Sequence, residues 1–174
     1  MDSQLLILGI GNEMRGDDAA GIVLARNLAG RFKGAARLES NPYMLWNLLQ
    51  SGIAQSHVAL IDAAEASDGF EVGQWCRFDY PDQMGMIDGT VLRNTHSVDV
   101  VSMLQLGETL NILPENVRIY AVAAADFEPG PQMSSLLKSH LPGIEAAIGD
   151  DLETWLEAEL CTSSPLHDPS ATSR

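Results

Sequence analysis

The chain has 174 residues, of which 45% are hydrophobic and 20% charged, and its formal net charge is −14. This length is typical of one domain with a substantial buried core, and no apolar run approaches the roughly 18 residues that a membrane span needs. The acidic charge excludes nucleic acid and anionic membranes as partners, because both bind through clusters of Lys and Arg; it suits a basic partner or a cation, or it simply maintains solubility.

Strands and helices alternate in the first part of the chain. Residues 5–9 form an apolar run typical of a strand buried on both faces, and a helix is predicted over residues 18–32. A short strand near residues 36–40 and a helix that starts at Pro42 follow. Residues 57–63, HVALIDA, read as a second buried strand.

The alternation continues to the end of the domain. Residues 71–80 are expected to be extended, as an edge strand, and residues 97–110 to be helical. A strand is predicted over residues 117–125, and a helical region over 132–160 that breaks at Pro142-Gly143. This order predicts an α/β three-layer sandwich: a mostly parallel twisted sheet of about five strands with helices on both faces.

The organisation expected from composition is a single α/β domain over residues 1–160 and a frayed tail over 161–174. The two cysteines, Cys76 and Cys161, lie far apart without CxxC spacing, which argues against a disulfide framework and a structural zinc site. Met1 to Ser3 lack the pattern of a signal peptide. We therefore expect a cytoplasmic protein without membrane insertion.

Polar residues gather where the predicted strands end. Asp17 and Asp18 follow the first strand, Asp62 lies near the end of the 57–63 strand, and Asn94-Thr95-His96 precede the next helix. Ligands of open α/β sheets bind beyond the carboxyl ends of the strands. Two carboxylates and an imidazole are therefore expected to converge there.

Each of these residues also has a structural explanation. One of Asp17 and Asp18 is better interpreted as stabilising the N-terminus of the helix that it opens. Asp62 is equally consistent with an N-cap, and His96 with a polar loop residue. The remaining histidines are interpreted as structural or surface residues: His57, His140 and His167.

Three other functional motifs are incomplete or absent. Gly9-x-Gly11 begins like a dinucleotide-binding loop, but Met14 stands where the third glycine is required. The chain has neither the GK[ST] of a phosphate-binding loop nor the GxSxG of a serine hydrolase. Neither phosphate binding nor a serine nucleophile is favoured.

Four segments in order resemble the nickel-iron hydrogenase maturation protease family. They are GIGNEMRGDDAAG at 9–21, LIDAAEA at 60–66, NTHSVDVVSML at 94–104 and YAVAAADFEPG at 120–130. The resemblance spans most of residues 4–150. It implies an aspartyl-type endopeptidase that removes a short C-terminal extension from a hydrogenase large-subunit precursor after nickel insertion.

The resemblance also implies a site. Asp18, Asp62 and His96 correspond to the nickel ligands, and Asp18 and Asp62 are the candidate catalytic residues. A supporting loop comprises Gly9, Gly11, Asn12 and Asp17. Nickel is expected to arrive with the substrate, so that no metal is tightly bound at rest.

One segment departs from the family pattern. Residues 38–46, LESNPYMLW, replace an acidic-glycine-glycine-threonine turn; Glu39 is shifted by one position, and Asn41 and Pro42 stand in place of the glycines. This difference favours an alternative, a non-proteolytic nickel-checking or chaperone module for hydrogenase assembly. It leaves the predicted ligand set intact.

Overall fold

The computed structural model describes residues 5–32, 36–38, 57–83, 95–114 and 116–162, with the backbone alone for 36–38, 95–99 and 159–162. Five strands form one sheet in the order β2-β1-β3-β5-β4. The strands are β1 (Leu5–Gly9), β2 (Ala36–Leu38), β3 (His57–Glu65), β4 (Trp75–Tyr80) and β5 (Asn116–Ala124). The helices are the 3-10 turn η1 (Gly16–Ala19), α1 (Ala20–Arg31), α4 (Thr95–Thr109) and α5 (Ser135–Thr162).

The sheet is mostly parallel, as predicted. β1 pairs in parallel with β2 and β3, and β3 with β5. β4 runs antiparallel to β5 at the edge, which confirms the edge strand expected within residues 71–80. None of the described helices is long and apolar enough to span a bilayer.

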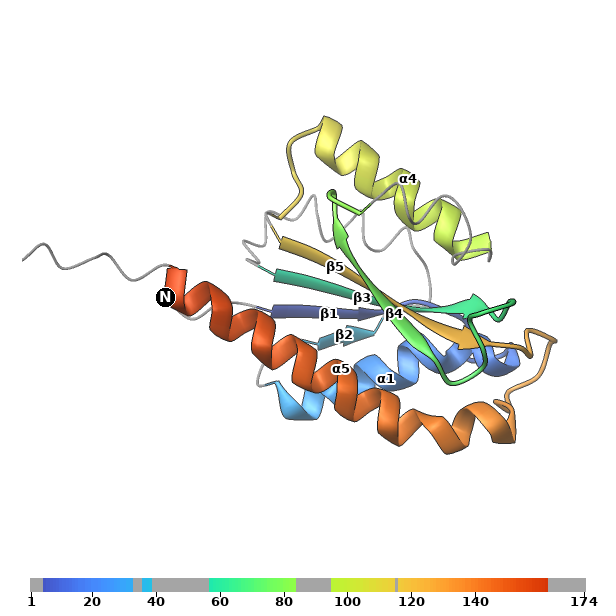
Figure 1. Cartoon of the computed structure of the whole chain (residues 1–174). Helices are drawn as coiled ribbons and strands as arrows, with labels where there is room; N and C mark the ends of the chain where they lie inside the picture. The colour runs from blue at the N-terminus through green and yellow to red at the C-terminus, as the bar shows by residue number, and fades with distance from the viewer. Residues whose placement is uncertain (1–4, 33–35, 39–56, 84–94, 115, 163–174) are drawn as a thin grey trace, which may run out of the picture.

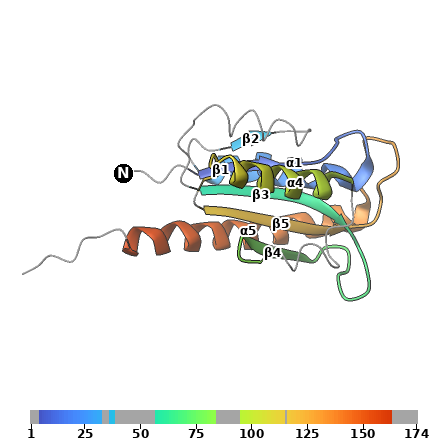
Figure 2. The ribbon, with the colours of Figure 1, turned by 90° about the horizontal axis from the view of Figure 1, so that it is seen from above.

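Helices cover both faces of the sheet, which confirms the three-layer sandwich. α1 and α5 lie on one face and α4 on the other (Figure 1), and Figure 2 shows the same layers from above with α4 nearest the viewer. Alternate residues of β3 face the two layers: Leu60 packs in the cluster that includes Leu104 of α4, and Ile61 in the cluster that includes Ile148 of α5.

The first helix lies close against the strands because glycines line the contact. A Cβ atom on Gly9 would collide with the backbone of Gly21, and one on Gly21 would collide with the carbonyl oxygens of Ile10 and Ile61. Gly11 has φ 142°, and a Cβ there would collide with the carbonyl oxygen of Asp18. The glycines of the motif therefore serve close packing of the backbone.

The predicted break at Pro142-Gly143 is wrong, because α5 continues through Pro142. Apolar side chains on both sides of the proline are buried, among them Leu137, Ile144 and Ile148. Each stabilises the docked helix by about 1.5–3 kcal/mol, which together exceeds the cost of about 3 kcal/mol for an internal proline. Tertiary packing therefore keeps the helix continuous.

Other predicted boundaries shift by a few residues. The helix predicted from residue 18 begins as η1 at Gly16, and α5 extends to Thr162, two residues into the expected tail. The helix expected from Pro42 and the tail beyond residue 162 lie outside the described residues. So does most of the unusual 38–46 segment, of which Leu38 closes β2.

A charged network docks α5 onto the antiparallel edge of the sheet. The Asp151 carboxylate accepts hydrogen bonds from Arg77 at 2.6 Å, from Arg118 at 3.1 Å and from the Tyr120 hydroxyl at 2.7 Å. Arg118 also donates to Asp79 at 2.6 Å. Burial and the bond to Asp151 raise the pKa of Tyr120, so this phenol stays protonated.

Candidate functional site

The carboxyl ends of β1 and β3 form the switch point of the sheet. From β1 the chain proceeds to β2 on one side, whereas β3 lies on the other side of β1. Ligand crevices of open α/β sheets form at such a point. The loop after β1 stays beside β3, since the Ile10 amide donates to the Ile61 carbonyl at 2.8 Å.

Asp17 connects three segments that are remote in the sequence. Its fully buried carboxylate accepts hydrogen bonds from the amides of Ala125 at 3.2 Å and Asp126 at 3.1 Å, just after β5. It also accepts from the amide of Ser134 at 2.7 Å and from the Ser134 hydroxyl at 3.0 Å. Ser134 in turn accepts from the Leu137 amide at 3.2 Å, so it caps α5.

The geometry therefore gives Asp17 a structural role, although a different one from that predicted. Neither η1 nor α1 has a side-chain cap, so Asp17 does not cap the helix that it opens. It instead binds the cap residue of α5, 117 positions away. The tertiary structure determines this contact, which no local pattern could predict.

The loops after β1 and β5 are also joined through their backbones. The amide of Gly16 donates to the carbonyl of Gly130 at 2.8 Å, and the amide of Gly130 donates to the carbonyl of Met14 at 2.8 Å. Asn12 shapes the first loop by accepting from the Met14 amide at 2.9 Å. The sequence predicted no role for Ser134 or for residues 125–130. Residues 125–130 do belong to the YAVAAADFEPG segment that resembles the family, so the resemblance was the one signal for this loop.

Asp18 and Asp62 lie at the switch point. Asp18 is 1% exposed and Asp62 3% exposed. Asp18 Oδ1 lies 3.7 Å from the position that a Cβ on Gly11 would take, so its carboxylate sits beside the loop after β1. Asp62 lies two residues from both Leu60 and Ala64, which pack toward α4, so its side chain projects to the same face of β3.

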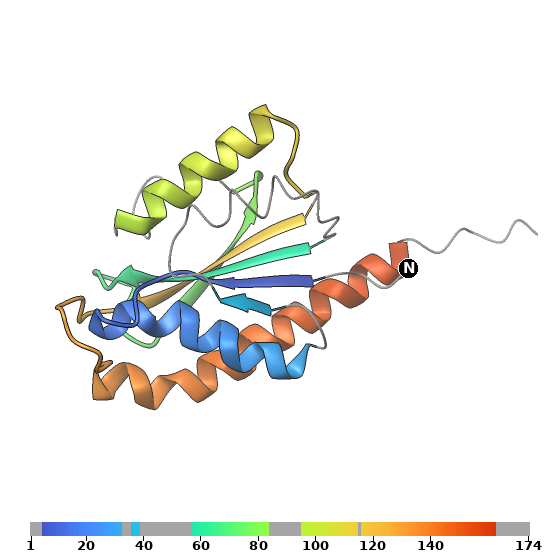
Figure 3. The same ribbon diagram turned by 180° about the vertical axis from the view of Figure 1, so that it is seen from behind.

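His96 belongs to the first turn of α4. The N-terminal end of this helix lies at the same edge of the sheet as the carboxyl ends of β1 and β3 (Figures 1 and 3). The His96 side chain lies outside the described residues. Among side chains that the structure does describe, no three of His, Cys, Asp or Glu are grouped to hold a metal ion, so the ligand set remains a prediction.

The remaining histidines and Cys76 are not members of the predicted ligand set. His57 is 1% exposed and makes an edge-to-face contact with Trp155 at 4.7 Å, in agreement with a structural role. Cys76 is half-buried on β4, and burial raises the pKa of its thiol to about 11, which opposes a nucleophilic role. His140 is exposed on α5, whereas His167 lies outside the described residues.

Comparison with known proteins identifies the fold. No protein-family model and no curated protein matches the sequence. The structure is similar to the nickel-iron hydrogenase maturation protease HybD from Thermococcus kodakarensis, with a TM-score of 0.71 and 21% identity over 86% of this chain and 98% of that one. The fold is that of the hydrogenase maturation proteases.

Two further solved structures of this fold align over similar lengths. The hydrogenase maturating endopeptidase HybD from E. coli has a TM-score of 0.69 and 15% identity, over 87% of this chain and 93% of that one. The maturation protease HycI from Thermococcus kodakarensis has a TM-score of 0.62 and 18% identity, over 87% and 93%. The fold implied by the sequence resemblance is confirmed.

Proposed function

We propose that this protein is an endopeptidase that removes a short C-terminal extension from a nickel-iron hydrogenase large-subunit precursor once nickel has been inserted. The observation that carries the proposal is the pair of buried carboxylates, Asp18 and Asp62, at the switch point of a fold shared with hydrogenase maturation proteases. The ordered motifs in the sequence point in the same direction.

Nickel enters this proposal as cargo of the precursor. Asp18, Asp62 and His96 offer carboxylate and imidazole donors, a set that suits divalent first-row ions. Three donors form an incomplete shell, which the precursor's own ligands would complete. A bound ion would report that the cofactor is loaded, and it could polarise the scissile carbonyl or activate water.

In this proposal the chain's own residues position the catalytic segment and remove a proton from the attacking water. Asp17 holds η1 against the loop after β5 and against α5, which fixes the backbone beside Asp18. Asp18 or Asp62 would accept a proton from the attacking water. The water oxygen adds to the scissile carbonyl carbon, the C–N bond breaks, and the leaving amine takes the proton.

Intact-mass measurement of the precursor tests the proposal. Nickel-loaded precursor should lose the mass of a short C-terminal peptide when the protein is added, whereas nickel-free precursor should not. Asp18→Asn and His96→Ala should abolish cleavage yet fold normally, and the exposed Asp82→Asn should cleave like the wild type. Protein first stripped with chelator should still cut the loaded precursor.

Three outcomes would contradict parts of this account. Uncut nickel-loaded precursor that nevertheless binds the protein would favour the nickel-checking module. Efficient cutting of nickel-free precursor by stripped protein would refute nickel as the signal. Full activity of Asp18→Asn would remove the carboxylate from the mechanism.

A further inference from the structure

Arg15 is the one arginine with a described side chain that forms no ion pair with another described residue. The other four each pair with at least one carboxylate: Arg26, Arg31, Arg77 and Arg118. The side chain of Arg15 is exposed, and its Nε donates to the carbonyl of Phe127 at 3.2 Å. A chain with 24 acidic residues thus keeps one arginine beside its candidate site without a described carboxylate partner.

The acidic residues of the two loops around Arg15 make other contacts. Glu13 accepts a hydrogen bond from Arg26 at 2.8 Å. Asp126 Oδ1 accepts from the amide of Glu128 at 3.1 Å, and the exposed Glu128 carboxylate forms no ion pair with Arg15. The guanidinium group of Arg15 is therefore available to a carboxylate from outside the described part of the chain.

The backbone and the side chain of Arg15 are both held against the loop after β5. Arg15 forms a parallel bridge with Gly130, through the 2.8 Å hydrogen bonds of Gly16 and Met14 to that glycine. The bond from Nε to Phe127 uses one of the five N–H donors of the guanidinium group. The four donors on the two Nη atoms remain, and such a pair of nitrogens can bind a carboxylate through two parallel hydrogen bonds. Because the side chain is already oriented, it loses less conformational entropy when it binds.

Arg15 and the candidate catalytic Asp18 belong to the same turn. The amide of Asp18 donates to the carbonyl of Arg15 at 3.0 Å. Gly16, between them, has φ 54°, and a Cβ atom there would collide with the carbonyl oxygen of Asp126. A group that binds Arg15 is therefore held close to Asp18.

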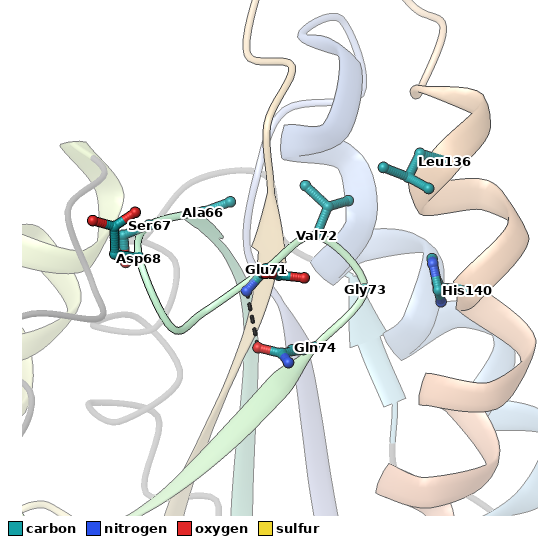
Figure 4. Close-up of a pocket in the computed structure, with 9 residues that line it drawn as sticks. All are labelled: Ala66, Ser67, Asp68, Glu71, Val72, Gly73, Gln74, Leu136 and His140. Atoms are coloured by element: carbon teal, nitrogen blue, oxygen red, sulfur yellow. Dashed lines mark hydrogen bonds between the residues drawn. The ribbon is translucent and has the colours of Figure 1, made fainter.

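The hollow that follows the carboxyl end of β3 has the opposite charge. It lies between the β3–β4 connection and the first turns of α5 (Figure 4), with a volume of about 720 Å³. Asp68 and Glu71 line it, and none of its described lining residues is Lys or Arg. This hollow would repel an anion, whereas Arg15 would attract one.

We propose that Arg15 is a specificity-determining residue that binds a carboxylate of the substrate precursor close to the scissile bond. The carboxylate is either an acidic side chain or the C-terminal carboxylate of the extension that is removed. The ion pair would position the substrate chain beside Asp18 without taking part in bond cleavage. The identity of the partner rests on the proposed function, whereas the availability of the cation does not.

Steady-state cleavage of nickel-loaded precursor tests this role. Arg15→Gln should raise KM about fivefold and leave kcat unchanged, because one exposed ion pair is lost outside the reacting centre. Arg15→Lys should have an intermediate KM, because lysine keeps the charge but lacks the planar fork. The matched control is Lys138→Gln, which removes an exposed cation on α5 and should change neither constant. An equal KM for Arg15→Gln and Lys138→Gln overturns the proposal.

A double-mutant cycle distinguishes recognition from a loosened loop, because Arg15→Gln also loses the bond to Phe127. One precursor carries Asn or Gln in place of the acidic residues that flank the scissile bond, and another has its C-terminal carboxylate amidated by ligation of a synthetic peptide. One of these changes should raise KM for the wild type about fivefold and have no further effect on Arg15→Gln, which identifies the source of the carboxylate. Effects that add independently for both precursors overturn the proposal.

Binding of the same nickel-loaded precursors, measured by surface plasmon resonance, separates failure of this inference from failure of the proposed function. If the precursor binds but is never cut, and the cycle shows coupling in Kd, the role of Arg15 stands and the peptidase fails. If the precursor is cut and neither cycle shows coupling, the role of Arg15 fails and the peptidase stands. A precursor that is neither bound nor cut overturns both.

Discussion

Replacing Asp17 with alanine should destabilise the fold far more than neutralising its neighbour Asp18. Asp17→Ala removes the acceptor for four hydrogen bonds and leaves the donors of Ala125, Asp126 and Ser134 without it. Hydrogen bonds to a charged group contribute about 1.5–3 kcal/mol each, and their losses are not additive because water can enter loops that loosen.

The expected loss in the free energy of unfolding is about 3–5 kcal/mol, against a total of about 5–15 kcal/mol for a natural domain. For a chain of this size each kcal/mol corresponds to about 2–4 °C in Tm, so Tm should fall by roughly 6–20 °C. Asp17→Asn should be intermediate, because the amide keeps one acceptor oxygen and turns an NH₂ group toward bound donors.

Asp18→Asn is the matched control. It retains the shape of the side chain while removing one carboxylate from a region with Asp17 and Asp62, so the free energy of unfolding should change by less than about 1 kcal/mol. Urea titration and calorimetry of the three variants measure the effect, and precursor cleavage should show the reverse order, with Asp18→Asn inactive and Asp17→Asn partly active. A Tm for Asp17→Ala within about 3 °C of the wild type, below the expected fall of roughly 6–20 °C, would refute this interpretation of the hydrogen bonds.

Two further predictions follow from burial and from helix geometry. In a Cys161→Ser background, Cys76 should react with iodoacetamide far more slowly than a free thiol at pH 8, because burial raises its pKa from 9.0 to about 11. The raised pKa also makes stability depend on pH. Below pH 9 the thiol is protonated in both states, and its contribution to the free energy of unfolding is fully present. Between pH 9 and 11 the thiol ionises only in the unfolded state, so this contribution is lost at up to about 1.4 kcal/mol per pH unit. A thiol that titrates near pH 8.5 by ultraviolet absorbance would contradict both statements. Pro142→Ala should raise the free energy of unfolding by about 1–2 kcal/mol in urea titration, because α5 is continuous through this position and alanine restores an amide donor; the gain is smaller than the helix propensity difference because the unfolded chain becomes more flexible. A loss of stability would show that the proline itself fits its surroundings better than a regular turn does.

The sequence by itself determined the described strands and the positions of α1 and α4, and the edge of the sheet at which the polar residues lie. Hydrophobic periodicity is a local property, and the runs at residues 5–9 and 57–63 are apolar because both faces of β1 and β3 are covered. Parallel pairing then brings the carboxyl-terminal ends of these strands to one edge, with Asp62 near the end of β3 and Asp18 in the turn after β1.

Only the tertiary structure distinguished Asp17 from Asp18. The two residues are chemically identical neighbours, and the difference arises because Ser134 and the loop after β5 fold back onto Asp17, more than 100 positions along the chain. The continuity of α5 was decided in the same way: Pro142 opposes a helix locally, whereas Leu137 and Ile144 on either side of it are buried against the sheet. Local patterns report what each residue prefers, and the packing of remote segments selects which preference prevails.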